Sequence, residues 1–258
     1  MNLEIKSIPF VATERVPIPE NLFEKKTFCD GEGTLPYRIY TPKEMSEGKK
    51  YPLILFFHGA GERGSDNEKQ LANAIGQFFA APDSPAYDCV VIAPQCPEDS
   101  KWVLLPEWVD TQYSTDELPE SPALTLAVKL IEETKRTLPI DPARVYSTGL
   151  SMGAYATWDL LVRHKGLLAA AIPVCGGCDY RYAERLKDMP ICTFHGDSDP
   201  TVPPDGTERM VNALLSLGSE SIGCTYYIGG MHNVWETAFA TEGLLDWLLS
   251  HRRTESAR

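Results

Sequence analysis

The stretch RVYSTGLSMGAYATWDLL, residues 144–161, decides the fold of this chain. Its first half is rich in β-branched and apolar residues, as in a buried strand, and its second half continues as a helical pattern. Between the halves, Gly149-Leu150-Ser151-Met152-Gly153 has the form G-x-S-x-G. In a strand–turn–helix, this motif lifts the serine hydroxyl off the sheet edge, and flanking side chains larger than glycine would collide with the neighbouring backbone. We therefore predict that Ser151 is a nucleophile; the simpler alternative is a serine that caps the helix between two turn glycines.

Outward from this turn, short apolar runs alternate with longer helical patterns. The runs predicted as strands are 37–40, 51–57, 89–93, 144–148, 169–174, 191–194 and 224–228. The predicted helices are 65–79, 124–138, 152–164, 207–217 and 233–250, with capping signatures at Ser65/Glu68, Ser121-Pro122 and Asn233/Glu236. Continuous apolar strands occur where helices cover both faces of a parallel sheet. The chain is thus predicted to be α/β, with a mostly parallel central sheet flanked by helices on both faces, and residues 1–258 to form a single domain.

The connection 94–120 has little helical or strand pattern. A loop this long in a compact domain is usually functional or disordered, and because it follows a strand it emerges at the carboxyl edge of the sheet, where ligands bind. We expect it to form a small cap over the active site and to carry most of the specificity. Lys101 alone opposes the acidic residues on or beside it, which favours a neutral or cationic substrate over a polyanion. These residues are Glu98, Asp99, Glu107, Asp110, Asp116, Glu117 and Glu120.

A serine nucleophile needs a positioned base, and the chain has five histidines. His251 lies in a charged tail, and His164 ends a helix. His58 and His195 each precede a glycine at a strand end, which indicates a structural role. His232 lies between the last strand and the last helix, after two glycines, and is predicted to be the base.

A carboxylate must hold the imidazole of the base. Asp197 and Asp199 both follow a strand and lie between the serine and the histidine in sequence, and either could instead simply cap the turn. We prefer Asp199. The resulting order Ser, Asp, His is that of α/β-hydrolases.

The turn His58-Gly59-Ala60-Gly61 follows the strongest strand and is predicted to form half of an oxyanion hole. Its two donors would be the backbone N–H groups of Ala60 and Met152. A phosphate-binding loop is the competing interpretation, but the Lys-Ser/Thr of a P-loop is missing. Glu62 and Arg63 are expected to pair locally.

The composition of the chain weighs against several classes of partner and of metal site. The chain has 258 residues and a formal net charge of −12, which opposes nucleic acid and anionic lipid surfaces. Its seven scattered cysteines do not resemble a disulfide framework, no secretory signal is visible, and no apolar run reaches the length of a membrane span. We expect a cytoplasmic protein. The CxxC at Cys175 and Cys178 lacks the further ligands of a zinc site, so no metal is predicted.

Six stretches carry a family resemblance: FFHGAGERGSDN (56–67), APQCPEDSKW (93–102), GLSMGAYATWDL (149–160), PVCGG (173–177), FHGDSDPTVP (194–203) and GGMHNVWETAF (229–239). They resemble the α/β-hydrolase superfamily. Within it, the chain is similar to small bacterial predicted peptidases or phospholipase/carboxylesterase-like proteins, related to feruloyl and polyhydroxybutyrate-depolymerase-like esterases. The resemblance implies the α/β-hydrolase fold and a triad made by the serine of G-x-S-x-G, the aspartate of D-x-x-V-P and the histidine of H-N-x-W. These map to Ser151, Asp199 and His232.

We therefore expect a serine carboxylesterase acting on small acyl or aryl esters, among them hydroxycinnamoyl and acetyl esters, with no metal or organic cofactor. Trp102 and Trp235 lie near the predicted active edge and are expected to line the substrate pocket. The alternatives are a peptidase of the prolyl-oligopeptidase kind and a binding module without catalysis. The expected partner is a small-molecule ester, with neither nucleic acid nor membrane, and the sequence leaves the oligomeric state open.

Overall fold

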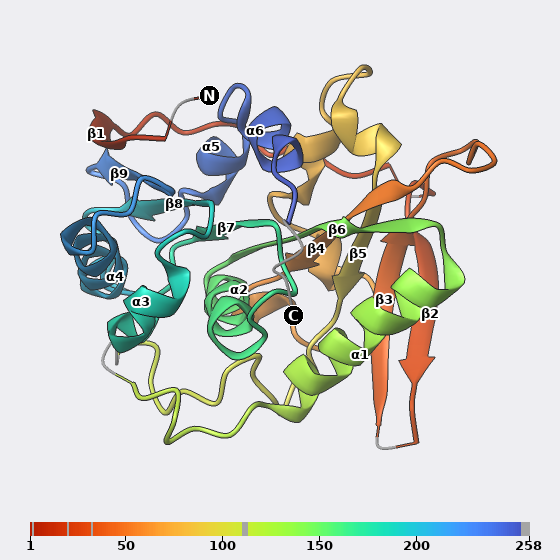
Figure 1. Ribbon diagram of the computed structural model, residues 1–258, viewed down its shortest axis with the longest axis horizontal. Helices are drawn as coiled ribbons and strands as arrows, with labels where there is room; N and C mark the ends of the chain where they lie inside the picture. Colours follow the sequence, from red (N-terminus) through yellow and green to blue (C-terminus); the bar gives the residue numbers. More distant parts are fainter. Residues whose placement is uncertain (2, 20, 32, 110–112, 254–258) are drawn as a thin grey trace.

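Nine strands form one sheet in the order β1-β9-β8-β7-β6-β4-β5-β3-β2 (Figure 1). The structure is a computed structural model that describes residues 1, 3–19, 21–31, 33–109 and 113–253, so Asp110 lies outside the described residues. The strands β2 and β3 pair antiparallel, as do β3 and β5, and all other neighbours are parallel. The strands are β1 (Ile5–Pro9), β2 (Glu24–Cys29), β3 (Thr34–Tyr40), β4 (Tyr51–Phe57), β5 (Val90–Pro94), β6 (Ile140–Leu150), β7 (Ala170–Val174), β8 (Ile191–Gly196) and β9 (Ile222–Ile228).

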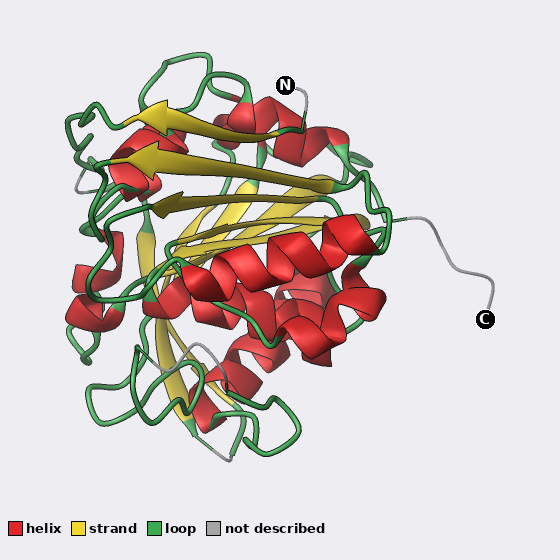
Figure 2. Ribbon diagram, turned by 90° about the vertical axis from the view of Figure 1, so that its left-hand side faces the viewer, coloured by secondary structure: helices red, strands yellow, loops and turns green. Residues whose placement is uncertain are grey.

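Helices cover both faces of this sheet, as predicted (Figure 2). The α-helices are α1 (Pro122–Thr137), α2 (Met152–Arg163), α3 (Ala183–Leu186), α4 (Asp205–Ser216), α5 (Trp235–Phe239) and α6 (Leu244–Ser250). The 3-10 turns are η1 (Ala60–Glu62), η2 (Lys69–Leu71), η3 (Ile75–Phe79), η4 (Pro85–Asp88) and η5 (Tyr180–Tyr182).

The two faces explain why β4 is apolar at every position. Leu53, Leu55 and Phe57 pack into a core shared with α1 and α2, whereas Ile54 and Phe56 pack into a second core shared with η3, α5 and α6. Successive side chains of a strand point to opposite faces, so a strand with a core on each side has no polar position. The fold class predicted from the sequence is confirmed.

All seven predicted strands are present, but β1 and β2 were not predicted. They are the two edge strands of the sheet, and most of their residues are exposed. An edge strand with exposed faces needs neither a continuous apolar run nor strict alternation, so its sequence carries little signal.

The predicted helix 65–79 is wrong: the described chain there has only the short turns η2 and η3. Asn67 and Ala74 have φ of 56° and 61°, a left-handed conformation that no helix accommodates. The backbone N–H groups of Glu68 and Lys69 donate to the Asp66 carboxylate, so Asp66 organises this segment in place of the predicted Ser65 cap.

The predicted helix 233–250 is also wrong in its extent. It is broken into α5 and α6, and Gly243 between them has φ of 71°. The Glu236 carboxylate does not close a capping box with Asn233. It accepts hydrogen bonds from Ala74 N and Gln77 Nε2, on a segment distant in sequence.

The other predicted helices are present as α1, α2 and α4, and the Ser121 cap is confirmed, with Oγ accepting from Leu124 N at 3.0 Å. Within the described parts of the chain, every helix falls short of the length and apolar character that crossing a membrane requires.

Candidate active site

Ser151 lies in the sharp turn between β6 and α2, and its backbone is held at φ 54° and ψ −122°. A Cβ added at Gly149 would lie 2.4 Å from Gly153 O, and one added at Gly153 would lie 2.0 Å from Phe57 O. Only glycine fits these two positions, as the motif predicted. The Ser151 side chain makes no capping hydrogen bond to α2, so the alternative of a simple helix cap does not describe this turn.

The Ser151 hydroxyl instead faces His232. The distance from Ser151 Oγ to His232 Nε2 is 2.8 Å, and that from His232 Nδ1 to Asp199 Oδ2 is 2.6 Å. A carboxylate can only accept, so Nδ1–H donates to Asp199 and Nε2 is left to accept the serine proton. The three side chains follow β6, β8 and β9, whose carboxyl ends meet at one edge of the sheet.

Asp197 lies outside this chain of hydrogen bonds. Its Oδ1 accepts from Gly229 N at 2.8 Å and from the Ser198 hydroxyl at 2.9 Å, so it ties the turn after β8 to the turn after β9. Of the two aspartates left open by the sequence, the structure therefore brings Asp199 to the histidine.

Asp199 is 5% exposed and surrounded by donors. Its Oδ1 accepts from Thr201 N and Val202 N, each at 2.9 Å. Burial by itself would raise the pKa of Asp199, but the hydrogen bonds from His195, His232 and Val202 N outweigh it and hold this pKa well below its usual range. The carboxylate is thus charged at neutral pH and can offset an imidazolium at His232.

His195 is fully buried behind Asp199. Its Nε2 lies 2.9 Å from Val202 O and 3.4 Å from Asp199 Oδ2, and its Nδ1 lies 2.8 Å from Thr207 Oγ1. The single Thr207 hydroxyl proton is directed to Gly176 O, at 2.6 Å, so the Thr207 oxygen accepts from the ring. His195 and His232 thus both approach Oδ2 of Asp199, and His195 helps to hold that carboxylate in place.

The remaining histidines that bear on the site are structural. His58 accepts from Cys96 N at Nε2, at 2.9 Å, and its Nδ1 donates to Gly59 O, at 2.6 Å. Burial lowers the pKa of His58 to about 4, so it stays neutral and fixes the loop after β4. His164 lies at the end of α2 and contacts Glu120.

The two predicted oxyanion donors lie at the starts of α2 and of the 3-10 turn η1. Met152 is the first residue of α2 and Ala60 the first of η1, where backbone N–H groups lack an intrahelical acceptor. A Cβ added at Gly59 would lie 3.5 Å from Ser151 Cβ, so the two turns approach closely.

The predicted Glu62–Arg63 ion pair does not occur among the described residues. Arg63 Nε donates to Ala60 O at 2.9 Å, and its Nη1 donates to Ser100 O at 3.1 Å. The Glu62 carboxylate accepts from Asn73 Nδ2 at 2.9 Å instead. Arg63 thereby fixes the carbonyl of Ala60 and ties the oxyanion turn to the loop 94–120.

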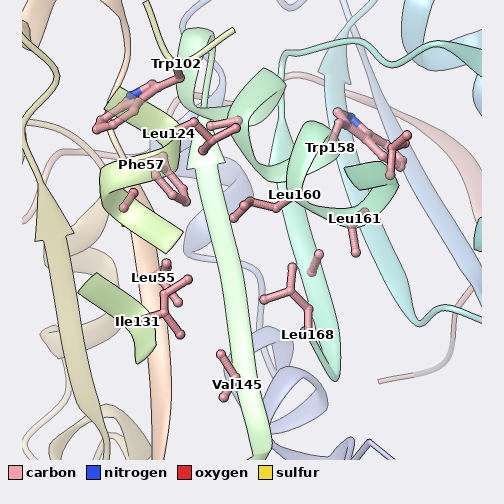
Figure 3. Packing of buried hydrophobic residues seen from close by; sticks show 14 of the residues in the cluster. Leu55, Phe57, Trp102, Leu124, Ile131, Val145, Trp158, Leu160, Leu161 and Leu168 are labelled. Atoms are coloured by element: carbon pink, nitrogen blue, oxygen red, sulfur yellow. The ribbon is translucent and has the colours of Figure 1, made fainter. Parts of the chain in front are cut away.

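Trp102 does not line an open pocket, contrary to expectation. It is fully buried, its ring lies edge-on to Phe57 at 5.0 Å, and its Nε1 donates to His58 O (Figure 3). Trp102 packs beneath the oxyanion turn as part of the core. Trp235 is half-buried, and its ring lies edge-on to His232 with centroids 5.4 Å apart, so it stays a candidate for contact with substrate.

The loop 94–120 has one isolated bridge, Val103 with Glu120, and otherwise lacks regular structure in its described part. Val103, Leu105 and Tyr113 pack against Tyr155 of α2 and Val202 beside Asp199. The loop therefore braces both the helix behind Ser151 and the turn that carries Asp199.

Cys175, His195 and Asp199 bring three metal-ligating atoms within 4.8 Å of one another. The imidazole and carboxylate atoms are already used in the hydrogen bonds described above. Burial raises the pKa of the Cys175 thiol far above its usual range, which disfavours the thiolate that a metal prefers. The arrangement fits a support for Asp199 better than a metal centre.

The sequence matches the phospholipase/carboxylesterase family over residues 43–242. Among curated relatives, NocK from Nocardia uniformis subsp. tsuyamanensis, whose name assigns it provisionally to the esterases, is 26% identical over 221 residues, which are 82% of this chain and 58% of the relative. Poly(3-hydroxyalkanoate) depolymerase C from Paucimonas lemoignei is 24% identical over 194 residues, 74% of this chain and 44% of the relative. The chain thus spans about half the length of these curated relatives.

Two solved esterase structures also superpose on this chain. A thermostable esterase superposes with a TM-score of 0.80 at 37% identity, covering 90% of this chain and 64% of that one. A ferulic acid esterase superposes with a TM-score of 0.65 at 15% identity, covering 88% and 98%. The second likeness shows the shared fold alone.

Proposed function

The chain belongs to the phospholipase/carboxylesterase family, and from this premise we propose that it is a serine carboxylesterase that hydrolyses small acyl or aryl esters through an acyl-enzyme. The observation that carries the proposal is the unbroken chain of hydrogen bonds from Ser151 through His232 to Asp199, at 2.8 and 2.6 Å. A hydroxyl, an imidazole and a carboxylate in this order form the arrangement that activates serine for acyl transfer.

In the proposed reaction, His232 Nε2 takes the Ser151 proton as Oγ attacks the ester carbonyl carbon. The carbonyl oxygen becomes an oxyanion and accepts hydrogen bonds from the N–H groups of Met152 and Ala60. His232 then gives its proton to the leaving alkoxide as the C–O bond breaks, and the acyl group stays on Ser151. Water, deprotonated by His232, attacks the acyl-enzyme and releases the acid. Throughout, Asp199 holds the tautomer and offsets the imidazolium charge.

The proposal extends to the setting of the enzyme. All nine described strands join one sheet, which supports a single domain, with the loop 94–120 as a small cap beside the site. All seven cysteines are free thiols, which fits the reducing cytoplasm. The net charge of −12 supports a small-molecule ester, rather than nucleic acid or an anionic membrane surface, as the partner.

Two assays test the function. A fluorophosphonate probe should label the wild-type protein and fail to label Ser151→Ala, because only an activated serine attacks the phosphorus. A panel of p-nitrophenyl esters and matched p-nitroanilides should then show hydrolysis of the esters. Faster relative turnover of proline-containing anilides would identify a peptidase, and the absence of labelling would indicate a module without catalysis.

A further inference from the structure

A cavity of about 300 Å³ lies on the side of Trp235 and Asn233, near His232, and none of the described residues of the loop 94–120 lines it. Its walls come from the N-terminal segment 10–15, from Asn73 and from the start of α5 with Trp235. Trp235 lies edge-on to His232 on one side, with ring centroids 5.4 Å apart. On the other side, Asn73 contacts Glu62, and a Cβ added at Gly59 would lie 3.1 Å from Glu62 Oε2. Trp235 thus stands between the cavity and the base, and Asn73 and Glu62 stand between the cavity and Gly59 of the oxyanion turn.

The N-terminal segment is fixed as a wall of this cavity. Thr13 N donates to Thr237 Oγ1 at 3.0 Å, and the Thr237 hydroxyl donates to Val11 O at 3.0 Å. Further along, a Cβ added at Gly76 would lie 1.7 Å from Val16 O, so the segment packs directly on η3. Figure 1 shows the chain after β1 crossing the molecule past α5. Segments more than 200 residues apart therefore build one cavity.

The walls combine two aromatic rings with one available cation. Phe10 is held edge-on by Tyr227, with centroids 5.8 Å apart, and Trp235 is held by His232. Arg15 donates from Nη1 to Ala72 O at 2.9 Å and forms no ion pair within the described part of the chain.

One acidic residue, Glu236, lines the cavity. Its two carboxylate oxygens accept hydrogen bonds from Ala74 N and Gln77 Nε2. Glu62 accepts from Asn73, which separates it from the cavity. Planar apolar walls suit an aromatic ring, and a guanidinium with donors to spare suits a carboxylate.

We propose that this cavity is a substrate subsite that takes an aromatic ring bearing a carboxylate, with Phe10 and Trp235 against the ring and Arg15 against the carboxylate. The subsite rests on the proposed esterase function and narrows its substrate to aromatic esters with an anionic substituent. The N-terminal segment thereby determines specificity, a role the sequence assigned to the loop 94–120. The described acidic residues of that loop do not line this cavity.

Two matched substrate pairs test the proposal. Methyl benzoate and monomethyl terephthalate differ by one carboxylate on the acyl side, and phenyl acetate and 4-acetoxybenzoate differ by one on the alcohol side. We expect wild-type kcat/KM to favour the carboxylate member of one pair, which shows which part of the ester enters the cavity. Arg15→Gln should lower kcat/KM for that member about fivefold and leave its uncharged partner unchanged.

Arg136→Gln, which removes an exposed arginine from α1, is the matched control and should change neither pair. Phe10→Leu should lower kcat/KM for both aromatic esters of the preferred pair and leave kcat/KM for the aliphatic ester methyl hexanoate unchanged. Equal effects of Arg15→Gln on charged and uncharged esters would overturn the subsite. If wild-type protein reacts with the fluorophosphonate and hydrolyses p-nitrophenyl acetate in that case, the esterase function stands alone. If it does neither, both proposals fall.

Discussion

Ser151 has a left-handed backbone that costs a non-glycine residue about 1–3 kcal/mol. Its neighbours make this conformation possible, because glycines at 149 and 153 remove the side chains that would collide with the backbone. The strain aims the hydroxyl at His232 rather than along α2. Cys175, at the end of the neighbouring strand, has a similar φ of 55°. Strained residues that the surrounding structure holds in place are typical of functional sites.

The asparagine variants of Asp199 and Asp197 should differ strongly in kcat. Asp199→Asn should lower kcat about four orders of magnitude, because an amide cannot offset the imidazolium and favours the wrong tautomer of His232. Asp197→Asn should stay within a few-fold of wild type, since its carboxylate holds only Gly229 N and Ser198. Steady-state hydrolysis of p-nitrophenyl acetate measures both variants. A larger loss of kcat in Asp197→Asn than in Asp199→Asn would make Asp197, rather than Asp199, the carboxylate that supports His232.

His195 should hold Asp199 in position for His232. Its Nε2 lies 3.4 Å from Asp199 Oδ2, the same oxygen that His232 Nδ1 contacts at 2.6 Å. In His195→Gln this contact and the hydrogen bond to Val202 O are lost, so the Asp199 carboxylate is held less firmly. Steady-state hydrolysis of p-nitrophenyl acetate should then show kcat lowered about tenfold.

Thr207→Ser keeps the hydroxyl that contacts His195 Nδ1, so it is the matched control and should keep the wild-type kcat. A wild-type kcat in His195→Gln would show that Asp199 keeps its position without His195.

The sequence predicts which three side chains come together, Ser151, Asp199 and His232, but it predicts the packing around them poorly. The G-x-S-x-G turn is a local feature, and the order of Ser151, Asp199 and His232 follows from strand succession. Trp102 is different, because nothing local tells whether a loop tryptophan turns toward solvent or toward the core. Its burial depends on Phe57, which is distant in sequence.

Among the elements, α1 is stabilised by a cap that also holds the loop 94–120. The Ser121 hydroxyl accepts from Leu124 N at 3.0 Å and donates to Trp102 O at 2.7 Å. Ser121→Ala should lower the free energy of unfolding by about 1–2 kcal/mol, because it removes the cap and leaves a buried carbonyl without its donor. Urea denaturation measures this free energy of unfolding. The control Ser216→Ala, on the exposed side of α4, should change the free energy of unfolding little. An effect within a few tenths of a kcal/mol would show that water replaces the cap.

The pair Asp159–Arg163 ties α2 to the same loop. Arg163 Nε donates to Asp159 Oδ2 at 2.7 Å, and its Nη2 donates to Thr115 O and Leu118 O. Asp159 is 1% exposed. Its burial raises its pKa to about 6 despite Arg163. The folded state therefore binds this proton more tightly than the unfolded chain, and the contribution of Asp159 to stability falls as the pH rises from about 4 through 6.

Asp159→Asn removes this titration. The stability of the variant relative to wild type should rise by about 2 kcal/mol between pH 4 and pH 7, as measured by urea denaturation across that range. The control Asp83→Asn, at an exposed aspartate, should differ in stability from wild type by the same amount at every pH. A difference that falls with pH would mean that Arg163 keeps Asp159 ionised throughout.

The successes and failures among the elements share one cause. The Ser121-Pro122 cap is satisfied within its own helix, so its signature is reliable. The same kind of signature occurs at Ser65/Glu68 and Asn233/Glu236. There, however, contacts with other parts of the chain determine the structure, and no capping box forms. Glu236 binds the backbone of Ala74 across the sheet edge, an interaction that no local pattern contains.

At the scale of the whole molecule, the N-terminal segment joins elements that lie at opposite ends of the chain. Strand β1 pairs with β9, and Thr13 in the following residues donates to Thr237 on the wall of the cavity. The family match begins at residue 43, so this segment lies outside the part of the chain that the family shares. A wall supplied from outside the shared region can change specificity while the triad stays in place.

The cysteines provide a test of the whole fold. Six of the seven are buried, and Cys29 at the end of β2 is exposed. Burial raises the pKa of Cys89, Cys96 and Cys192 to about 12, so their thiolates are scarce as well as inaccessible. N-ethylmaleimide should therefore add once to the native protein, at Cys29, and Cys29→Ser should stay unmodified, as intact mass and peptide mapping would show. In urea all seven should react. Native modification at Cys175 would mean that the core beneath the triad opens, since this thiol lies beside His195 and Asp199 at the centre of the sheet edge.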